Sequence, residues 1–372
     1  MKIVAPAWRL VSLMAAVIAM AVACAPLPWA SSRQATSNDP VFSQAAAAYE
    51  MIDLDWYDAK RKRAVPVRLY LPKAAVARDV PGQASTQARA TDAVGVPLVV
   101  FSHGMGGSRN GYSYLADDWA SHGIASLHVQ HVGSDRSLWQ GAAVSVLWRV
   151  QEAAGSEEAM ARALDVHFAL DQILASPYAM RIDKTRIAAA GHSYGANTSM
   201  LVAGANVIHD GKLLDLVDPR IKAAVLISSP PFYGEQDFMS ILKTVTVPTL
   251  HITSTADVID IPGFNSGIED RIRVFDAMGS RSKTLAVFKG GSHSIFTDRA
   301  NTGGAGLNPL VKRATGELSR LFLWEQFGGT SGTQIATSQS RQEFAAWETR
   351  NAAILESFKT LAVQLPTAGK IN

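Results

Sequence analysis

One short segment, residues 191–195, constrains the fold of this chain more than any other. Its sequence is Gly-His-Ser-Tyr-Gly, and it lies between an apolar run at 186–190 that predicts a strand and a helical pattern at 196–205. In a strand–turn–helix setting such a serine lies on a tight, strained turn, where a Cβ two residues to either side would crowd it. The turn lifts the Ser193 hydroxyl to the edge of a sheet and to a helix N-terminus. Ser193 is therefore a candidate nucleophile.

Apolar runs that predict strands alternate with helical patterns along most of the chain. Strands are predicted at 50–57, 64–71, 97–101, 124–129, 186–190, 221–227, 249–253 and 284–288, and helices at 112–122, from a Ser156 cap onward, and at 196–205. The polar turn at 58–63 predicts that the first two strands form a hairpin. Strands separated by helices indicate βαβ units, so we expect an α/β fold with a mainly parallel central sheet and helices on both faces.

A few stretches depart from this alternation. Residues 73–96 predict an exposed loop, residues 132–155 a long connection, and residues 229–247 a segment that covers a site. In the tail, apolar residues recur at three- and four-residue steps, which predicts a helix that folds back onto the domain. They are Phe344, Trp347, Ile354, Phe358 and Leu361.

The N-terminal residues carry the pattern of a bacterial export signal. Lys2 and Arg9 flank the start of an apolar segment at 10–23, which is shorter than the roughly 20 residues that a membrane-spanning helix needs. Cys24 follows directly after Ala-Val-Ala, which predicts lipoprotein cleavage and acylation of Cys24. The alternative is ordinary cleavage at an Ala-x-Ala site, with no role for the cysteine. Residues 24–47, rich in Ala, Ser and Pro, read as a tether, so we expect a protein of the cell envelope.

Charge and cysteine content exclude two classes of function. The net charge of the 372 residues is +3, and it falls to +1 without residues 1–23, because Lys2 and Arg9 are the only charged residues lost. A nucleic-acid-binding protein needs a concentrated basic face, which this chain does not suggest. Cys24 is the only cysteine, which rules out intrachain disulfides and any multi-cysteine zinc site.

A nucleophilic serine needs a base, and the base needs an orienting carboxylate. Of the nine histidines, His293 comes straight after the last predicted strand, downstream of the serine and at the same sheet edge. The carboxylate should lie between Ser193 and His293 in the sequence, directly after a strand. Asp257 lies closely after the strand at 249–253, Asp260 is its rival, and Asp237 lies in the predicted cover. The alternative role for Asp257 or Asp260 is to cap the helix near Ile268.

The negative oxygen of a tetrahedral intermediate needs N–H donors that are fixed in advance. One donor should be the backbone N–H of Tyr194, the residue after the candidate nucleophile. The other should come from residues 102–107, Ser-His-Gly-Met-Gly-Gly, which follow the strand at 97–101. We assign it to Met105, with Gly104 as the rival. A glycine-rich turn also suits a phosphate, but the lysine of a nucleotide-binding loop is missing.

These motifs together resemble the α/β-hydrolase superfamily, and more narrowly its predicted dienelactone hydrolases, platelet-activating-factor acetylhydrolases and polyester-hydrolase-like enzymes. The likeness spans about residues 50–325. It is carried by residues 101–106, by residues 131–135 (His-Val-Gly-Ser-Asp), by residues 191–195, and by Asp257 with His293. The resemblance implies an α/β-hydrolase catalytic domain over 48–372, with a C-terminal helical extension.

The resemblance also implies a serine esterase that works through an acyl-enzyme without a metal or organic cofactor. Ser193 would attack an ester, His293 would relay the proton, and Asp257 would orient the histidine. Met105 and Tyr194 would hold the oxyanion. The expected partner is a small-molecule ester, uncharged or lipid-like and of short to medium acyl length. We expect no nucleic acid, and membrane contact only through the lipid anchor.

Two of the chain's departures from these families bear on the choice of substrate and of acid. True dienelactone hydrolases use a cysteine where Ser193 stands, so dienelactone is a poor substrate guess. The acetylhydrolases place their acid after the strand that follows the nucleophile's helix, and here that strand ends in two serines, Ser228 and Ser229, which favours Asp257. An amidase or peptidase on the same scaffold, and a non-catalytic envelope binding protein, remain the alternatives. Four aromatic residues are candidates either to line the pocket or to pack in the core: Trp139, Trp148, Phe232 and Tyr233.

Overall fold

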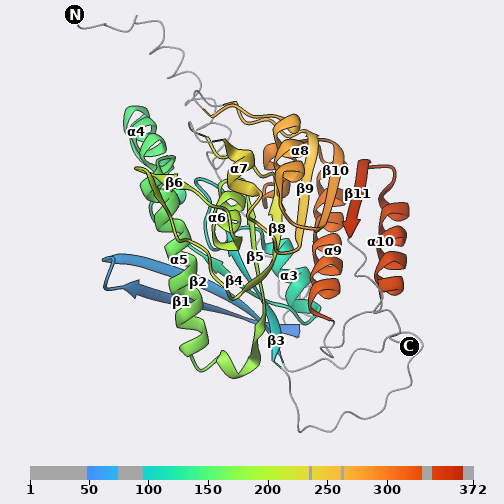
Figure 1. Cartoon of the computed structure of the whole chain (residues 1–372), viewed down its shortest axis with the longest axis horizontal. Helices are drawn as coiled ribbons and strands as arrows, with labels where there is room; N and C mark the ends of the chain where they lie inside the picture. Colours follow the sequence, from blue (N-terminus) through green and yellow to red (C-terminus); the bar gives the residue numbers. More distant parts are fainter. Residues whose placement is uncertain (1–47, 74–94, 234–236, 261–263, 329–336, 363–372) are drawn as a thin grey trace, which may run out of the picture.

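The computed structural model describes residues 48–73, 95–233, 237–260, 264–328 and 337–362. Within these residues a nine-stranded sheet has the order β1-β2-β4-β3-β5-β8-β9-β10-β11 (Figure 1). Its strands are β1 (Tyr49–Asp58), β2 (Arg63–Pro72), β3 (Val96–Ser102), β4 (Ala125–Val129), β5 (Ile182–His192), β8 (Ile221–Ile227), β9 (Thr249–Ala256), β10 (Ser282–Ser292) and β11 (Leu355–Ala362). Neighbours from β4 to β10 pair in parallel, which confirms the expected sheet.

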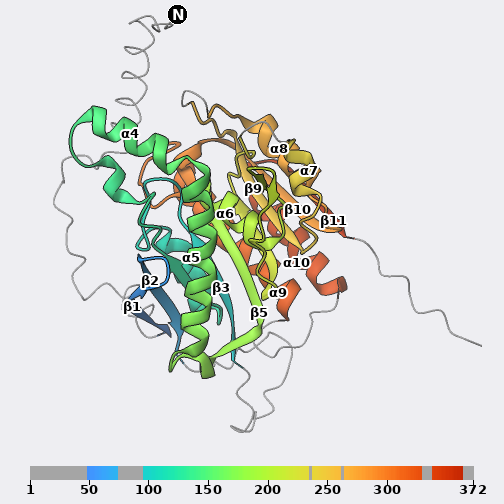
Figure 2. The ribbon, with the colours of Figure 1, turned by 60° about the vertical axis from the view of Figure 1, so that its left-hand side comes forward.

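Helices cover both faces of this sheet. One core cluster joins the strands to α5 (Ser156–Ala175), α6 (Tyr194–Ala203), α7 (Phe238–Leu242) and α8 (Ile268–Ala277). The other joins them to α3 (Ser113–Ser121), α9 (Leu307–Phe327) and α10 (Thr337–Asn351). Helix α5 runs along one face of the sheet (Figure 2). This layering confirms the α/β class.

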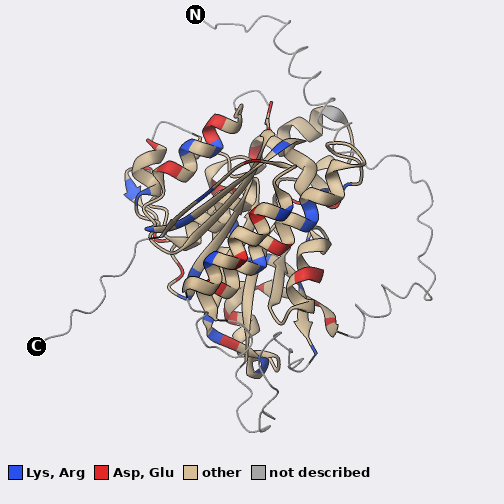
Figure 3. Ribbon diagram, turned by 90° about the vertical axis from the view of Figure 1, so that its right-hand side faces the viewer, with Lys and Arg blue, Asp and Glu red and all other residues tan. Residues whose placement is uncertain are grey.

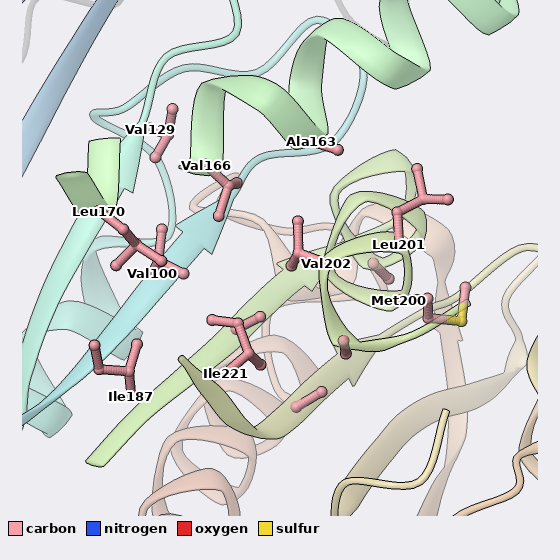
Figure 4. Close-up of a cluster of buried hydrophobic side chains, with 14 of the residues drawn as sticks. Val100, Val129, Ala163, Val166, Leu170, Ile187, Met200, Leu201, Val202 and Ile221 are labelled. Atoms are coloured by element: carbon pink, nitrogen blue, oxygen red, sulfur yellow. The ribbon is translucent and has the colours of Figure 1, made fainter. Parts of the chain in front are cut away.

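The central strands read as continuous apolar runs because both of their faces are buried. Figure 4 shows Val100, Ile187 and Ile221, from three strands, gathered with Val166 and Leu170 of α5. All of these residues except Ile221 are no more than 1% exposed, and Ile221 is 3% exposed. Full burial of such a side chain stabilises the fold by roughly 1.5–3 kcal/mol. The sheet is therefore a rigid base for the loops at its edge.

The predicted hairpin at the start of the domain is confirmed. β1 and β2 pair antiparallel along their whole length. The Asp58 carboxylate holds the turn, because it accepts the backbone N–H groups of Lys60 at 3.0 Å and Arg61 at 3.1 Å. The polar residues at 58–63 therefore form the turn of the hairpin, as their sequence pattern predicts.

The predicted long connection at 132–155 contains two helices that the sequence patterns did not indicate. This stretch contains a 3-10 helix, η1 (Arg136–Trp139), and the helix α4 (Ala143–Ala153). Val146 and Val150 of α4 are buried, whereas Val144 and Trp148 are 54% and 68% exposed. The helix that follows is capped by Gly155, and Ser156 is its first residue rather than its cap.

The prediction for the tail is right in its first half and wrong in its second. Helix α10 ends at Asn351, and β11 then pairs antiparallel with β10 at the edge of the sheet. The C-terminal extension is therefore a helix followed by a strand. Ile354, Phe358 and Leu361 are spaced as on a helix, but the unpaired edge of β10 offers backbone hydrogen bonds that periodicity cannot reveal.

The export signal, the tether and most of the predicted loop at 73–96 lie outside the described residues. No helix within the described ranges is long and apolar enough to cross a membrane. On the side shown in Figure 3, basic and acidic residues are interspersed rather than gathered by sign.

Candidate active site

Ser193 lies on the turn between β5 and α6, with φ 56° and ψ −123°. This backbone conformation is strained for any residue other than glycine. A Cβ on Gly191 would lie 2.2 Å from the carbonyl oxygen of Gly195, and one on Gly195 would lie 1.9 Å from that of Ser102. The turn is held by the Ser193 N–H, which donates to the carbonyl of Ile227 at 2.9 Å. Both glycines are therefore steric requirements of the turn.

The structure brings Ser193, His293 and Asp257 together. β5, β9 and β10 are parallel, so the residues that follow them meet at one edge of the sheet. His293 Nε2 lies 2.7 Å from Ser193 Oγ, and His293 Nδ1 lies 2.6 Å from Asp257 Oδ1. In the tautomer that satisfies both contacts, Nδ1–H donates to the carboxylate and Nε2 accepts from the serine hydroxyl.

Asp257 is fully buried and surrounded by donors. Its Oδ2 accepts the Thr253 hydroxyl at 2.7 Å, and the Arg271 guanidinium lies 3.4 Å from both carboxylate oxygens. Burial alone would raise the pKa of Asp257, but His293 and Arg271 outweigh it and hold this pKa well below its usual range. Asp257 is thus ionised and poised to stabilise a protonated His293.

The two rival aspartates occupy other places. Asp260 is exposed and lines the cavity in front of Ser193, without a hydrogen bond to His293. Asp237 caps the short helix α7, where its carboxylate accepts the N–H of Met239 at 3.1 Å.

The glycine-rich segment after β3 forms the wall opposite Ser193. The Gly104 N–H is already engaged, because it donates to Tyr112 Oη at 3.2 Å. Within the described part of the chain, the N–H groups of Met105 and Tyr194 have no hydrogen-bond partner. Both residues line the same cavity as Ser193. This geometry favours Met105 over Gly104 as the second donor.

His192 and Tyr112 link the two loops, and the sequence patterns did not reveal this link. Tyr112 Oη lies 2.9 Å from His192 Nδ1, and His192 Nε2 lies 2.9 Å from the carbonyl oxygen of His293. Burial lowers the pKa of His192 to about 3, so its neutral ring donates from Nε2 and accepts at Nδ1. A chain of hydrogen bonds therefore runs from Gly104 through both side chains to the His293 backbone.

A cavity of ≈ 2220 Å³ opens in front of Ser193 and His293. Its apolar lining includes Trp139, Met160, Leu201, Leu216, Phe232 and Ile241. Of the four aromatic candidates, Trp139, Phe232 and Tyr233 line it, whereas Trp148 lies on the exposed face of α4. Among the described residues, no group of three or more His, Cys, Asp or Glu side chains is placed to hold a metal ion.

Comparisons with known proteins agree with this geometry. A family model for platelet-activating factor acetylhydrolase, isoform II, matches residues 63–160, and a model for PET hydrolase-like proteins matches residues 146–320. Among solved structures, a ferulic acid esterase from Streptomyces cinnamoneus superposes with a TM-score of 0.52 at 19% identity, over 79% of this chain and 95% of the esterase. No curated protein matches. The structural likeness establishes the α/β-hydrolase fold, and the two family models support ester hydrolysis.

Proposed function

We propose that this protein is a serine ester hydrolase that acts through an acyl-enzyme, with Ser193 as the nucleophile. The observation that carries the proposal is the unbroken chain of hydrogen bonds from Asp257 through His293 to Ser193 Oγ, at the wall of a large cavity. The likeness to esterase and polyester-hydrolase families supports ester chemistry.

The geometry defines the order of bond changes. Ser193 Oγ attacks the ester carbonyl carbon while its proton passes to His293 Nε2, and Asp257 stabilises the imidazolium. The tetrahedral intermediate collapses, and the alcohol leaves with the proton from His293. A water molecule then attacks the acyl-enzyme and gives a proton to His293. Collapse of the second intermediate releases the acid and returns that proton to Ser193.

The oxyanion of both intermediates would be held by the N–H groups of Met105 and Tyr194. These donors flank Ser193 and are free of other partners in the described part of the chain. Loss of one such donor reduces kcat by about 10²–10³-fold in enzymes of this kind.

The substrate that best suits the cavity is an uncharged or lipid-like carboxylic ester of short to medium acyl length. Met160, Leu201 and Phe232 give the site an apolar wall, and transfer of apolar surface out of water yields about 25 cal/mol per Å². Charged acyl groups would lose their hydration against this apolar wall.

The decisive test combines Ser193→Ala with covalent labelling by a fluorophosphonate. Ser193→Ala should abolish turnover of p-nitrophenyl butyrate and remove the label while the melting temperature stays unchanged. Ser294→Ala is the matched control, because Ser294 also lines the cavity but does not contact His293 through its hydroxyl in the structure. Near-normal turnover by Ser193→Ala would show that the nucleophile is another residue. A p-nitroanilide of the same acid, tested beside the ester, decides between esterase and amidase.

A further inference from the structure

A buried arginine on α5 lies beneath the loop that carries Met105. Arg162 is 0% exposed and donates three hydrogen bonds to three separate parts of the chain. Its Nε bonds to Thr198 Oγ1 on α6 at 2.9 Å, its Nη1 to Ser134 Oγ at 2.6 Å, and its Nη2 to the His103 carbonyl oxygen. One guanidinium thus ties together α6, the loop after β4 and the loop after β3.

No carboxylate among the described residues forms an ion pair with Arg162, and all three of its acceptors are neutral. The nearest link to an acid runs through Ser134, whose hydroxyl donates to Glu158 at 2.8 Å, and Glu158 is itself paired with Arg63. Burial lowers the pKa of Arg162, but a guanidinium keeps its proton in proteins. The carboxylates of Glu158 and Asp165 lie close enough to oppose the effect of burial on this pKa. A buried cation without a direct ion-pair partner is still costly, so a negative charge that develops nearby during the reaction would stabilise Arg162 further.

Arg162 reaches both halves of the oxyanion site. The His103 carbonyl that it holds lies two residues before Met105. The guanidinium also lies over the ring of Tyr194, 4.4 Å from its centre. Arg162 therefore contacts the segments that present both N–H donors, without facing the substrate itself.

We infer that Arg162 is a positioning residue for the oxyanion hole, which sets the geometry of the two donors and places a positive charge behind them. This inference rests on the proposed function. It concerns the negative oxygen of the intermediates, not the proton transfer between Ser193 and His293.

A second buried group supports the same loop and gives the motif at 131–135 a role. His131 Nε2 lies 3.1 Å from Ser102 Oγ, and its Nδ1 lies 3.1 Å from Asp165. The His131 backbone N–H donates to His103 Nε2 at 3.1 Å. All four residues are at most 1% exposed, so this second Ser-His-Asp arrangement is closed to substrate and braces the base of the loop.

The test compares an ester with its thionoester in enzymes altered at Arg162. Oxyanion donors are set for oxygen at 2.7–3.1 Å, whereas sulfur is larger and a weak acceptor, so the thionoester depends less on them. Arg162→Lys keeps the positive charge but cannot reach all three acceptors, and Arg162→Met removes both the charge and the hydrogen bonds. We expect kcat for p-nitrophenyl butyrate to fall about 10–100-fold in Arg162→Lys, with KM nearly unchanged, and to fall further in Arg162→Met. The loss in Arg162→Lys is smaller than the effect of deleting one donor, because the donors are displaced rather than removed. The ester-to-thionoester ratio of kcat/KM should fall with it.

Two further variants make the result decisive. Arg186→Lys alters another buried arginine, which lies on β5 and bonds to Asp183, and should leave the ratio unchanged. Ser134→Ala removes one acceptor of Arg162 and replaces the Arg162 variants if these do not fold; it should lower the ratio about 3–10-fold. An unchanged ratio in folded Arg162 variants, or in Ser134→Ala where those do not fold, overturns the inference. Turnover by Ser193→Ala in the same panel would instead overturn the proposed function.

Discussion

Replacing Asp257 by asparagine tests whether this carboxylate orients the proposed base, His293. The structure explains why an amide cannot take the place of the carboxylate. Both carboxylate oxygens accept from donors. His293 and Arg271 approach Oδ1, while Thr253 and Arg271 approach Oδ2. An asparagine NH₂ at the Oδ1 position would meet the Arg271 N–H and would have to donate to His293 Nδ1. That contact places the imidazole proton on Nε2, where it blocks acceptance from Ser193.

The alternative orientation of the amide does not rescue the site. An NH₂ at the Oδ2 position would face Arg271 Nε–H, so a buried donor–donor contact remains. Loss of the negative charge also leaves the imidazolium without its counter-ion. In triads of this geometry the Asp-to-Asn change lowers kcat by about 10⁴-fold, which equals roughly 5.4 kcal/mol of transition-state stabilisation.

The assay is hydrolysis of p-nitrophenyl butyrate at pH 7–8, with thermal melting of each variant as the folding control. Asp260→Asn is the matched substitution, because Asp260 lines the same cavity but is exposed and makes no bond to His293. We expect Asp260→Asn to stay within about threefold of the wild type. Asp257→Asn activity within tenfold of wild type, or a larger loss in Asp260→Asn, would refute the assignment of the acid.

Three other predictions follow from the structure. Gly195→Ala, whose Cβ would lie 1.9 Å from the Ser102 carbonyl oxygen, should lose about 3 kcal/mol or more of stability and melt at least about 4 °C lower. Gly306→Ala, whose Cβ would meet nothing within 4 Å, is its control, and equal melting of the two variants would contradict the steric explanation. The pKa of Asp257 is lower in the folded chain than its ordinary value near 4. The ionised carboxylate therefore stabilises the fold fully above about pH 4, and this stabilisation is lost as the pH falls toward the pKa of Asp257 in the folded protein. Urea unfolding should therefore show a gap between wild type and Asp257→Asn at pH 7 that narrows at pH 3, and a constant gap would argue against a depressed pKa. Cys24→Ser should move the protein from the membrane to the soluble fraction, and unchanged membrane association would remove the case for a lipid anchor.

The parts of the fold that were predictable from sequence are those where one local signal dominates. The central strands are apolar throughout because both faces are buried, and residues 191–195 leave few conformations open. His293 and Asp257 could be selected because parallel strands bring their carboxyl ends to one edge, which makes chain position a guide to spatial position. Asp257 and Asp260 are three residues apart, however, so only coordinates show which carboxylate reaches His293.

The parts that were not predictable depend on surfaces that a single chain segment does not encode. Helix α4 buries Val146 and Val150 while it exposes Val144 and Trp148, so an apolar residue in this segment does not by itself mark a packed face. Strand β11 exists because β10 has a free edge to pair with. Its residue spacing matches a helix equally well. Its pairing partner lies 67 to 80 residues earlier in the chain, since Leu355 pairs with Phe288 and Ala362 with Ser282.

Helix α5 shows why the sequence patterns did not reveal what supports the loop after β3. Its second half buries apolar residues such as Val166 and Leu170, but its first half buries Glu158, Arg162 and Asp165 at three- and four-residue steps. Charged residues at such spacing ordinarily indicate a solvated face. Here the inward face changes from apolar to charged where the helix passes beneath the loops after β3 and β4, because the backbone carbonyls and side chains there need donors. The same helix therefore packs the core at one end and supports the candidate site at the other. A buried helix face that changes from charged to apolar residues along its length is the signal to seek in related sequences.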